Sequence, residues 1–193
     1  MTELILPPLA LYVHLPWCIR KCPYCDFNSH VHKGVLPQQA YIDALLEDLA
    51  LDAISVSGRS VDTIFFGGGT PSLFSPDSMA RLMSGIRARV EVAGDAEVTM
   101  EVNPGAIERG SFVGYQQAGI NRVSLGAQSF GAHQLRLLGR IHDPNDTVQS
   151  LAELHESGIV NFNLDLMHGL PEQSVAEALT DIEQGLSLSL IHI

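Results

Sequence analysis

The chain has 193 residues, of which 46% are hydrophobic and 17% are charged, and its formal net charge is −11. This length and composition fit one globular domain with its own core and exclude an intrinsically disordered chain. The acidic balance argues against sequence-independent nucleic-acid binding, which needs basic surface, and no apolar run reaches the length of a membrane span.

Strands and helices are predicted to alternate along the first half of the chain. An apolar run over 9–15 predicts the first strand, and an amphipathic stretch over 37–54 predicts a helix that ends before Gly58. The second strand covers 61–66 and runs into three glycines. The next helix begins at Ser75-Pro76-Asp77, with proline in its first turn. A third strand over 97–101 precedes a helix expected from about 108 to 118.

The second half continues the same alternation. A strand is predicted over 122–126, short helical pieces over 134–138 and 144–156, and a fifth strand over 161–167. Ser174 with Glu177 forms a capping-box pattern that begins a last helix to about Leu186. This repeated order of strand and helix predicts a parallel sheet with crossover helices. We interpret residues 190–193 as the start of a sixth strand.

All three cysteines lie directly after the first predicted strand, where Cys18, Cys22 and Cys25 follow the spacing C-x3-C-x2-C. Three clustered thiols with no cysteine elsewhere cannot build a disulfide framework and predict a soft-metal site. An iron–sulfur cubane held by three thiolates keeps one iron open to a small molecule. Zinc with His14 or His30 as a fourth ligand, or inert buried thiols, are the alternatives. Clustered reduced cysteines also predict a cytoplasmic protein.

Polar or glycine-rich groups follow each of the other strands. In a parallel α/β barrel the active site lies at the C-terminal ends of the strands, so these groups are expected to share one rim. The glycines let a backbone approach a ligand closely, but no Lys-Ser/Thr follows, which excludes a P-loop. The residues alone leave simpler interpretations open: a tight turn at the glycines, satisfied strand-end polar groups, a solvated arginine and a core tyrosine. The groups concerned are Gly67–Thr70, Glu101, Gln128, Asp165, Arg140 and Tyr12.

The cysteine spacing after a first strand resembles the signature of radical S-adenosylmethionine (radical SAM) proteins. The longer string from Tyr12 to His30, which reads YVHLPWC, then CPYCDFNSH, is similar to the oxygen-independent coproporphyrinogen III oxidase-like branch, and within it to heme chaperones. The resemblance covers about residues 11–188. It implies an α/β fold, the radical SAM partial (β/α)6 barrel. The chain, 1–193, would then be a core domain truncated after about five βα units, without the family's C-terminal domain.

The resemblance also implies a set of ligands. Cys18, Cys22 and Cys25 would hold three irons of a [4Fe-4S] cluster, and the fourth iron would bind S-adenosyl-L-methionine (SAM). Reductive cleavage of SAM would then give a 5′-deoxyadenosyl radical. The positions that resemble contacts to the cluster-bound SAM are Tyr12, Gly68 and Glu101. Those that resemble contacts to a second SAM molecule are Tyr24, Gly69, Thr70, Gln128, Arg140 and Asp165.

Two features distinguish the activities within this branch. The pattern of coproporphyrinogen oxidases is C-x3-C-x2-C-x-C, preceded by a long N-terminal leader. Here Phe27 takes the place of the further cysteine, and only a short segment precedes the first strand. We therefore expect a chaperone that binds heme and transfers it to an acceptor protein, with a flavodoxin or ferredoxin as electron donor. An oxygen-independent coproporphyrinogen III oxidase of porphyrin biosynthesis is the alternative, and a zinc-stabilised binding module is a third hypothesis.

Overall fold

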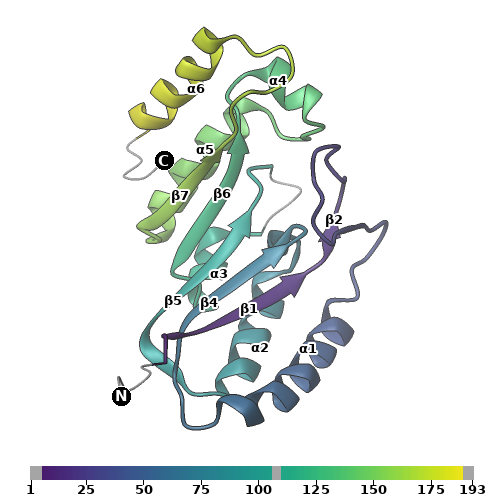
Figure 1. The fold of residues 1–193 in the computed structure, drawn as a ribbon, viewed down its shortest axis with the longest axis vertical. Coiled ribbons are helices and arrows are strands. Elements are labelled where there is room, and N and C mark those ends of the chain that lie inside the picture. The colour runs from purple at the N-terminus through teal and green to yellow at the C-terminus, as the bar shows by residue number, and fades with distance from the viewer. Residues whose placement is uncertain (1–5, 106–109, 189–193) are drawn as a thin grey trace, which may run out of the picture.

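The computed structural model describes residues 6–105 and 110–188, and its centre is a five-stranded, parallel sheet (Figure 1). The strand order is β1-β4-β5-β6-β7. A second, two-stranded sheet pairs β2 with β3. The predicted parallel α/β architecture is therefore confirmed. The strands are β1 Leu9–Leu15, β2 Trp17–Cys18, β3 His30–Val31, β4 Val61–Gly68, β5 Val92–Val102, β6 Arg122–Gln128 and β7 Asn161–Leu166.

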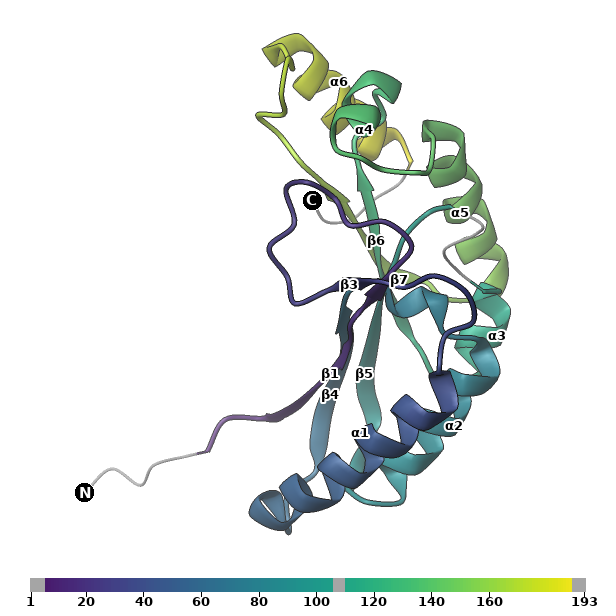
Figure 2. The ribbon, with the colours of Figure 1, turned by 90° about the vertical axis from the view of Figure 1, so that its right-hand side faces the viewer.

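Helices cover one face of the large sheet. Figure 2 shows α1, α2, α3 and α5 together on this face, while the loop between β2 and β3 lies on the other side, at the C-terminal ends of the strands. Among the helices in the described ranges, none combines the length and the apolar character of a membrane span. The helices are α1 Gln38–Asp52, η1 Ala53–Val56, η2 Pro71–Leu73, α2 Pro76–Arg87, α3 Phe112–Gln117, α4 Ala132–Leu137, α5 Pro144–Ser157 and α6 Val175–Ser187.

The predicted elements are present, but several begin or end elsewhere. The third predicted strand starts earlier, at Val92. The helix after it starts later, at Phe112, because Ser111 caps it by accepting the Gly114 N–H. The pairing of β2 with β3 was not predicted. Residues 108–109, at the predicted start of that helix, and 190–193, the predicted sixth strand, lie outside the described residues.

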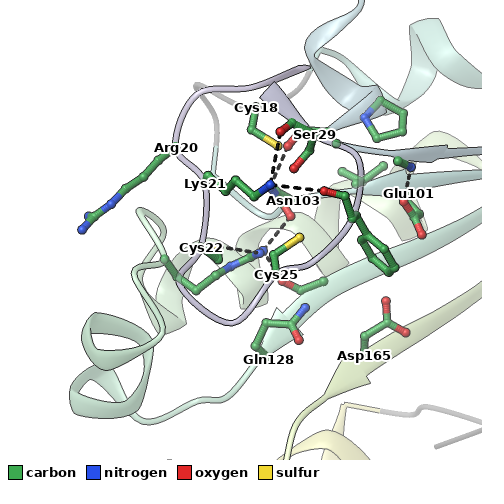
Figure 3. Close-up of a pocket in the computed structure, with 18 of the residues that line it drawn as sticks. Cys18, Arg20, Lys21, Cys22, Cys25, Ser29, Glu101, Asn103, Gln128 and Asp165 are labelled. Atoms are coloured by element: carbon green, nitrogen blue, oxygen red, sulfur yellow. Dashed lines mark hydrogen bonds between the residues drawn. The ribbon is translucent and has the colours of Figure 1, made fainter. Parts of the chain in front are cut away.

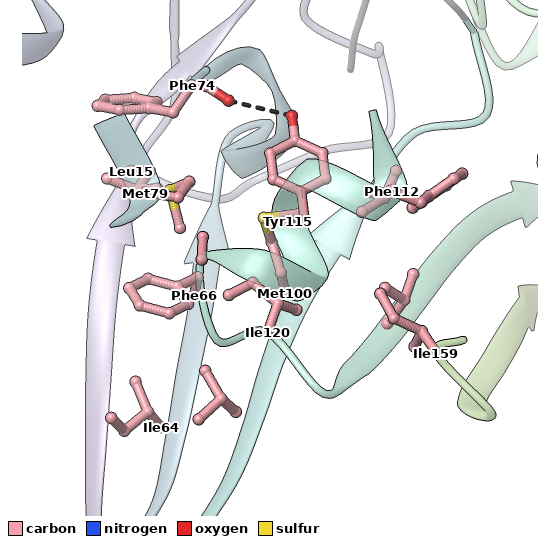
Figure 4. Close-up of a cluster of buried hydrophobic side chains, with 14 of the residues drawn as sticks. Leu15, Ile64, Phe66, Phe74, Met79, Met100, Phe112, Tyr115, Ile120 and Ile159 are labelled. Carbon is pink, nitrogen blue, oxygen red and sulfur yellow. Dashed lines mark hydrogen bonds between the residues drawn. The ribbon is translucent and has the colours of Figure 1, made fainter. Parts of the chain in front are cut away.

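The core fills the space between the sheet and the helices on its covered face (Figure 4). Leu15, Phe66 and Met100 project from three adjacent strands and are fully buried. Helix α2 buries four apolar side chains whose spacing places them on one face of the helix. Ser75 caps this helix by accepting the Ser78 N–H at 3.2 Å. Those four side chains are Met79, Leu82, Met83 and Ile86. With one face covered by helices, the sheet presents polar groups on its open face.

Candidate functional site

A cavity of about 320 Å³ opens at the C-terminal ends of the strands, within the size range of small-molecule sites (Figure 3). Every strand of the large sheet except β1 contributes a residue to its wall, and β2 with the loop after it supplies the cysteines. Of the predicted cluster ligands and SAM contacts, all but Tyr12 line it. They are Cys18, Cys22, Tyr24, Cys25, Gly68, Gly69, Thr70, Glu101, Gln128, Arg140 and Asp165.

The loop that carries the cysteines is closed at its base by backbone hydrogen bonds. The His30 N–H donates to the Pro16 carbonyl at 2.7 Å, and the His32 N–H donates to the Cys18 carbonyl at 3.0 Å. Within the loop, the Cys25 N–H donates to the Cys22 carbonyl at 3.1 Å and forms a tight turn. These bonds fix both ends of the loop, so all three thiols face one cavity.

Two hydroxyl groups adjoin the Cys18 thiol. Burial raises the pKa of Cys18, while the nearby hydroxyls of Thr70 and Ser29 oppose that rise. The Ser29 side chain is 4% exposed, yet its Oγ completes no hydrogen bond with a described residue. A buried hydroxyl beside a thiol, with no other partner among the described residues, is available to donate to a sulfur atom. This arrangement fits an iron–sulfur cluster, whose sulfur atoms accept hydrogen bonds.

The zinc alternative finds less support in the geometry. A single zinc ion needs its donors about 2.0–2.3 Å from one point. Across 6–105 and 110–188, no three His, Cys, Asp or Glu side chains converge in this way. His14 uses Nδ1 with the Tyr12 hydroxyl at 3.0 Å and Nε2 with the Asn28 carbonyl at 2.8 Å, and His30 Nε2 contacts Asn28 Oδ1 at 3.2 Å. Both ring nitrogens of His14 and one of His30 are thus engaged in hydrogen bonds rather than directed at the thiols.

The glycine segment after β4 is shaped by close packing against the cysteine-bearing segment. Gly68 has a φ of +118°, and its N–H donates to Glu101 Oε2 at 3.2 Å. A Cβ on Gly69 would lie 2.6 Å from the Trp17 carbonyl oxygen and 2.7 Å from the Pro16 carbonyl carbon. The glycines therefore permit close packing of two backbone segments, and Gly68 and Gly69 also line the cavity.

Two carboxylates face the cavity: Glu101 on β5 and Asp165 on β7, the strands on either side of β6. Burial is the main cause that raises the pKa of Glu101, and the nearby charge of Asp165 adds to it, whereas the Gly68 N–H lowers it. Asp165 accepts hydrogen bonds from Ser124 Oγ at 2.8 Å and from Asn163 Nδ2 at 2.6 Å. Fixed carboxylates of this kind can accept from an ammonium group or from sugar hydroxyls.

Gln128 lies at the end of β6 in an unusual backbone conformation. Its φ of +66° is in the left-handed region that non-glycine residues seldom adopt. Its carbonyl accepts the Met167 N–H at 2.9 Å, which ties the end of β6 to the segment after β7. Held strain of this type is common at functional sites, because the surrounding structure must maintain it.

Arg140 is half-buried and bonded within the protein, so the interpretation as a solvated arginine is wrong. Its Nη2 donates to Asn103 Oδ1 at 2.6 Å and to the Gly126 carbonyl at 2.7 Å, and its Nη1 lies 4.0 Å from Cys22 Sγ. Burial raises the pKa of Tyr24 to about 12, although the neighbouring Arg140 charge opposes this. The guanidinium therefore joins the cysteine loop to the ends of β5 and β6.

Tyr12 lies beside the cavity and is not part of the core. Its side chain is 56% exposed and stacks on Phe65, with ring centroids 6.3 Å apart. A Cβ on Gly67 would approach both the Tyr12 ring and Glu101 Oε2 at 3.1 Å, so the two predicted residues flank the same glycine. Burial raises the pKa of the Tyr12 hydroxyl, and Glu101 adds to this rise.

Three uncharged polar residues in the wall were not predicted from the sequence: Ser29, Asn103 and Ser124. A signal for two of them existed. Side chains alternate between the faces of a strand, so Asn103 shares a face with Glu101, and Ser124 shares one with Gln128. The cysteine loop offers no such periodicity, and Ser29 could not be found in this way.

The fold and the site together define a cofactor-binding α/β domain, a parallel sheet with a three-thiol loop at the C-terminal ends of its strands. Residues 12–184 match the model of the Radical SAM superfamily, and the chain belongs to this superfamily. Its members use SAM and a [4Fe-4S] cluster, which agrees with the cofactors that the cysteine spacing implied.

Named relatives extend this finding. The chain is 53% identical to heme chaperone HemW of Escherichia coli (strain K12) over 97% of its length, which is 50% of that protein. It is 40% identical to the mitochondrial radical S-adenosyl methionine domain-containing protein 1 of Bos taurus over 92% of its length, and 40% of that protein. Among solved structures, coproporphyrinogen III oxidase (HemN) from Escherichia coli matches with a TM-score of 0.85 and 32% identity, covering 94% of this chain and 42% of that one. The chain spans about half the length of the curated relatives it matches.

Proposed function

We propose that this chain is the radical SAM core domain of a heme chaperone, a protein that binds heme and transfers it to an acceptor. The observation that carries the proposal is the 53% identity to heme chaperone HemW across 97% of the chain. Phe27 adds support, because it takes the position at which the coproporphyrinogen oxidase motif has a further cysteine. Its side chain is 62% exposed and lines the cavity. The likeness to HemN, at a TM-score of 0.85, supports an oxygen-independent coproporphyrinogen III oxidase as the second candidate.

In this proposal Cys18, Cys22 and Cys25 hold the cluster, and the cavity beside them receives SAM. When bound, the cluster and SAM supply a one-electron cleavage that yields methionine and a 5′-deoxyadenosyl radical. Glu101 would accept from a polar group of SAM, and the glycine backbone would let the molecule approach without side-chain obstruction. The proposed contacts to this molecule are Tyr12, Gly68 and Glu101, and those to a second one are Tyr24, Gly69, Thr70, Gln128, Arg140 and Asp165.

The proposal includes partners that no residue of the site identifies by itself. They are heme, a heme-acceptor protein, and a flavodoxin or ferredoxin as the source of the electron, all in the cytoplasm. Tyr24 and Phe27 line the cavity with two exposed aromatic rings, beside the thiols.

Anaerobic reconstitution with iron and sulfide tests the proposal. The chain is expected to bind about four iron atoms and to show the paramagnetic signal of a reduced cubane. The Cys18/Cys22/Cys25→Ser triple variant should bind none. Binding of a single zinc ion, with no iron retained, would reject both radical SAM candidates.

The two candidates are then separated by their ligands. Reduced protein with SAM is incubated either with heme and a heme-free globin as acceptor, or with coproporphyrinogen III. A stable heme complex that passes heme to the globin, without decarboxylation of coproporphyrinogen, is the expected result. Formation of protoporphyrinogen would overturn the ranking and favour the oxidase.

A further inference from the structure

A line of hydrogen bonds runs through Asn103, the residue after β5, toward two of the cysteines. Asn103 Nδ2 donates to Thr70 Oγ1 at 3.3 Å, and Asn103 Oδ1 accepts from Arg140 Nη2 at 2.6 Å. The three residues come from the end of β5, the glycine segment after β4 and the segment after α4. We call Thr70, Asn103 and Arg140 the polar bridge.

Each end of the polar bridge lies at a thiol, and Asn103, at its centre, lies among the cysteines in Figure 3. At one end, the Thr70 N–H donates to the carbonyl of Trp17, the residue before Cys18, at 2.8 Å, and the Thr70 hydroxyl lies within hydrogen-bond reach of the Cys18 thiol. At the other end, Arg140 Nη1 lies 4.0 Å from Cys22 Sγ. The bridge therefore links Cys18 to Cys22 through side chains, independently of the cysteine loop itself.

The direction of the hydrogen bonds follows from the amide of Asn103. Because Thr70 Oγ1 accepts the amide N–H, its own proton is left to donate, and the acceptor beside it is the sulfur of Cys18. Thr70 is only 4% exposed, so water does not compete for this proton. Arg140 has a fixed position because the same Nη2 also donates to the Gly126 carbonyl at 2.7 Å.

We propose that Asn103 is a positioning residue that aims the Thr70 hydroxyl and the Arg140 guanidinium at two cluster thiolates and thereby raises the reduction potential of the cluster. This inference rests on the proposed function only in requiring that the three cysteines hold a cluster. Sulfur atoms gain negative charge when a cluster is reduced, so O–H and N–H donors stabilise the reduced form more than the oxidised form. The potential is thus set partly by residues that are not ligands.

The expected size follows from one lost donor. Removing a hydrogen bond to a charged group in a buried site changes an equilibrium about tenfold. For a one-electron couple, a tenfold change corresponds to about 59 mV. Loss of the Thr70 donor should therefore lower the midpoint potential by about this amount while leaving the three thiolates in place.

Two variants remove the donor in different ways. Thr70→Val replaces the hydroxyl with a methyl group of similar shape. Asn103→Asp keeps the shape of the amide, but a carboxylate can only accept, so it draws the Thr70 proton away from Cys18 and adds a negative charge. Thr70→Ser retains the donor. Thr147→Val removes a buried hydroxyl of α5, outside the cavity wall, that has no hydrogen-bond partner among the described residues.

The test is an anaerobic redox titration of the reconstituted full chain, followed by paramagnetic resonance, with iron content and thermal melting measured in parallel. Thr70→Val should lower the midpoint potential by about 59 mV, and Asn103→Asp should lower it further. Thr70→Ser and Thr147→Val should match the wild type. Unchanged potentials in Thr70→Val and Asn103→Asp, with full iron content, would overturn the role of the bridge. A wild-type chain that forms no cubane would instead reject the proposed function.

Discussion

Replacing Asp181 on α6 should strongly lower the free energy of unfolding, although its place on an amphipathic helix suggests a surface charge. It is only 6% exposed, and its carboxylate accepts three hydrogen bonds, two of them from a distant part of the chain. Ser129 Oγ donates at 2.7 Å, the Phe130 N–H at 2.8 Å and Gln173 Nε2 at 3.3 Å. Ser129 and Phe130 directly follow Gln128, so Asp181 anchors the segment that holds Gln128 in its left-handed conformation.

The magnitude follows from these three bonds. Asp181→Ala leaves the buried Phe130 N–H and Ser129 O–H without an acceptor, and each such orphan costs about 1–3 kcal/mol. We therefore expect a loss of about 3 kcal/mol in the free energy of unfolding, a large part of the stability of a domain. Asp181→Asn keeps one acceptor oxygen for the Phe130 N–H and should cost about half as much.

The assay is urea denaturation followed by the fluorescence of Trp17, the single tryptophan of the chain. A matched control is Glu183→Gln, which changes an exposed carboxylate on the same helix and should alter the midpoint little. If Asp181→Ala unfolds within about 0.5 kcal/mol of the wild type, the carboxylate does not anchor this segment, and the reasoning fails.

Three further predictions concern pH, the glycine segment and the core. Burial lowers the pKa of His142 from 6.5 to about 4. As the pH falls, this histidine therefore takes up a proton in the unfolded chain before it does so in the folded one. The free energy of unfolding should then fall by up to about 3 kcal/mol between pH 6.5 and pH 4. Urea titrations across this range should lose that dependence in His142→Gln but keep it in His168→Gln, an exposed control. Gly69→Ala, whose Cβ would lie 2.6 Å from a backbone oxygen, should abolish SAM binding in calorimetry, whereas Gly94→Ala, in open space, should not. Tyr115→Phe should lower the free energy of unfolding by about 1–2 kcal/mol in urea, because the buried hydroxyl bonds three backbone groups; an unchanged midpoint would contradict this.

Much of the fold was predictable because its signals are local. Continuous apolar runs mark strands that are buried in a parallel sheet, and the capping pair Ser174 and Glu177 is present at the start of α6 as predicted. The cysteine loop was predictable for the same reason, since its three thiols lie within one short segment. Where the sequence carries a signal at short range, the structure agrees with it.

The features that were missed depend on contacts between distant residues. Asp181 reads as a surface charge on an amphipathic helix, and only its bonds to residues 129 and 130 make it a buried anchor. Asn103 reads as part of a turn before Pro104, and its role depends on Thr70 and Arg140. The two-residue strands β2 and β3 are too short to produce a periodic pattern, because alternation needs at least four residues to be recognised.

The distribution of positive charge around the thiols follows from the acidic character of the whole chain. With 22 acidic and 11 basic side chains, the general field repels an anionic cluster, so cations must be placed locally. Lys21 Nζ donates to the Phe27 and Ser29 carbonyls at 3.3 Å each, on one side of the loop, and Arg140 reaches Cys22 from the other. Both cations are held by backbone oxygens as well, so the groups that offset the charge of the thiolates also fix the shape of the loop that presents them.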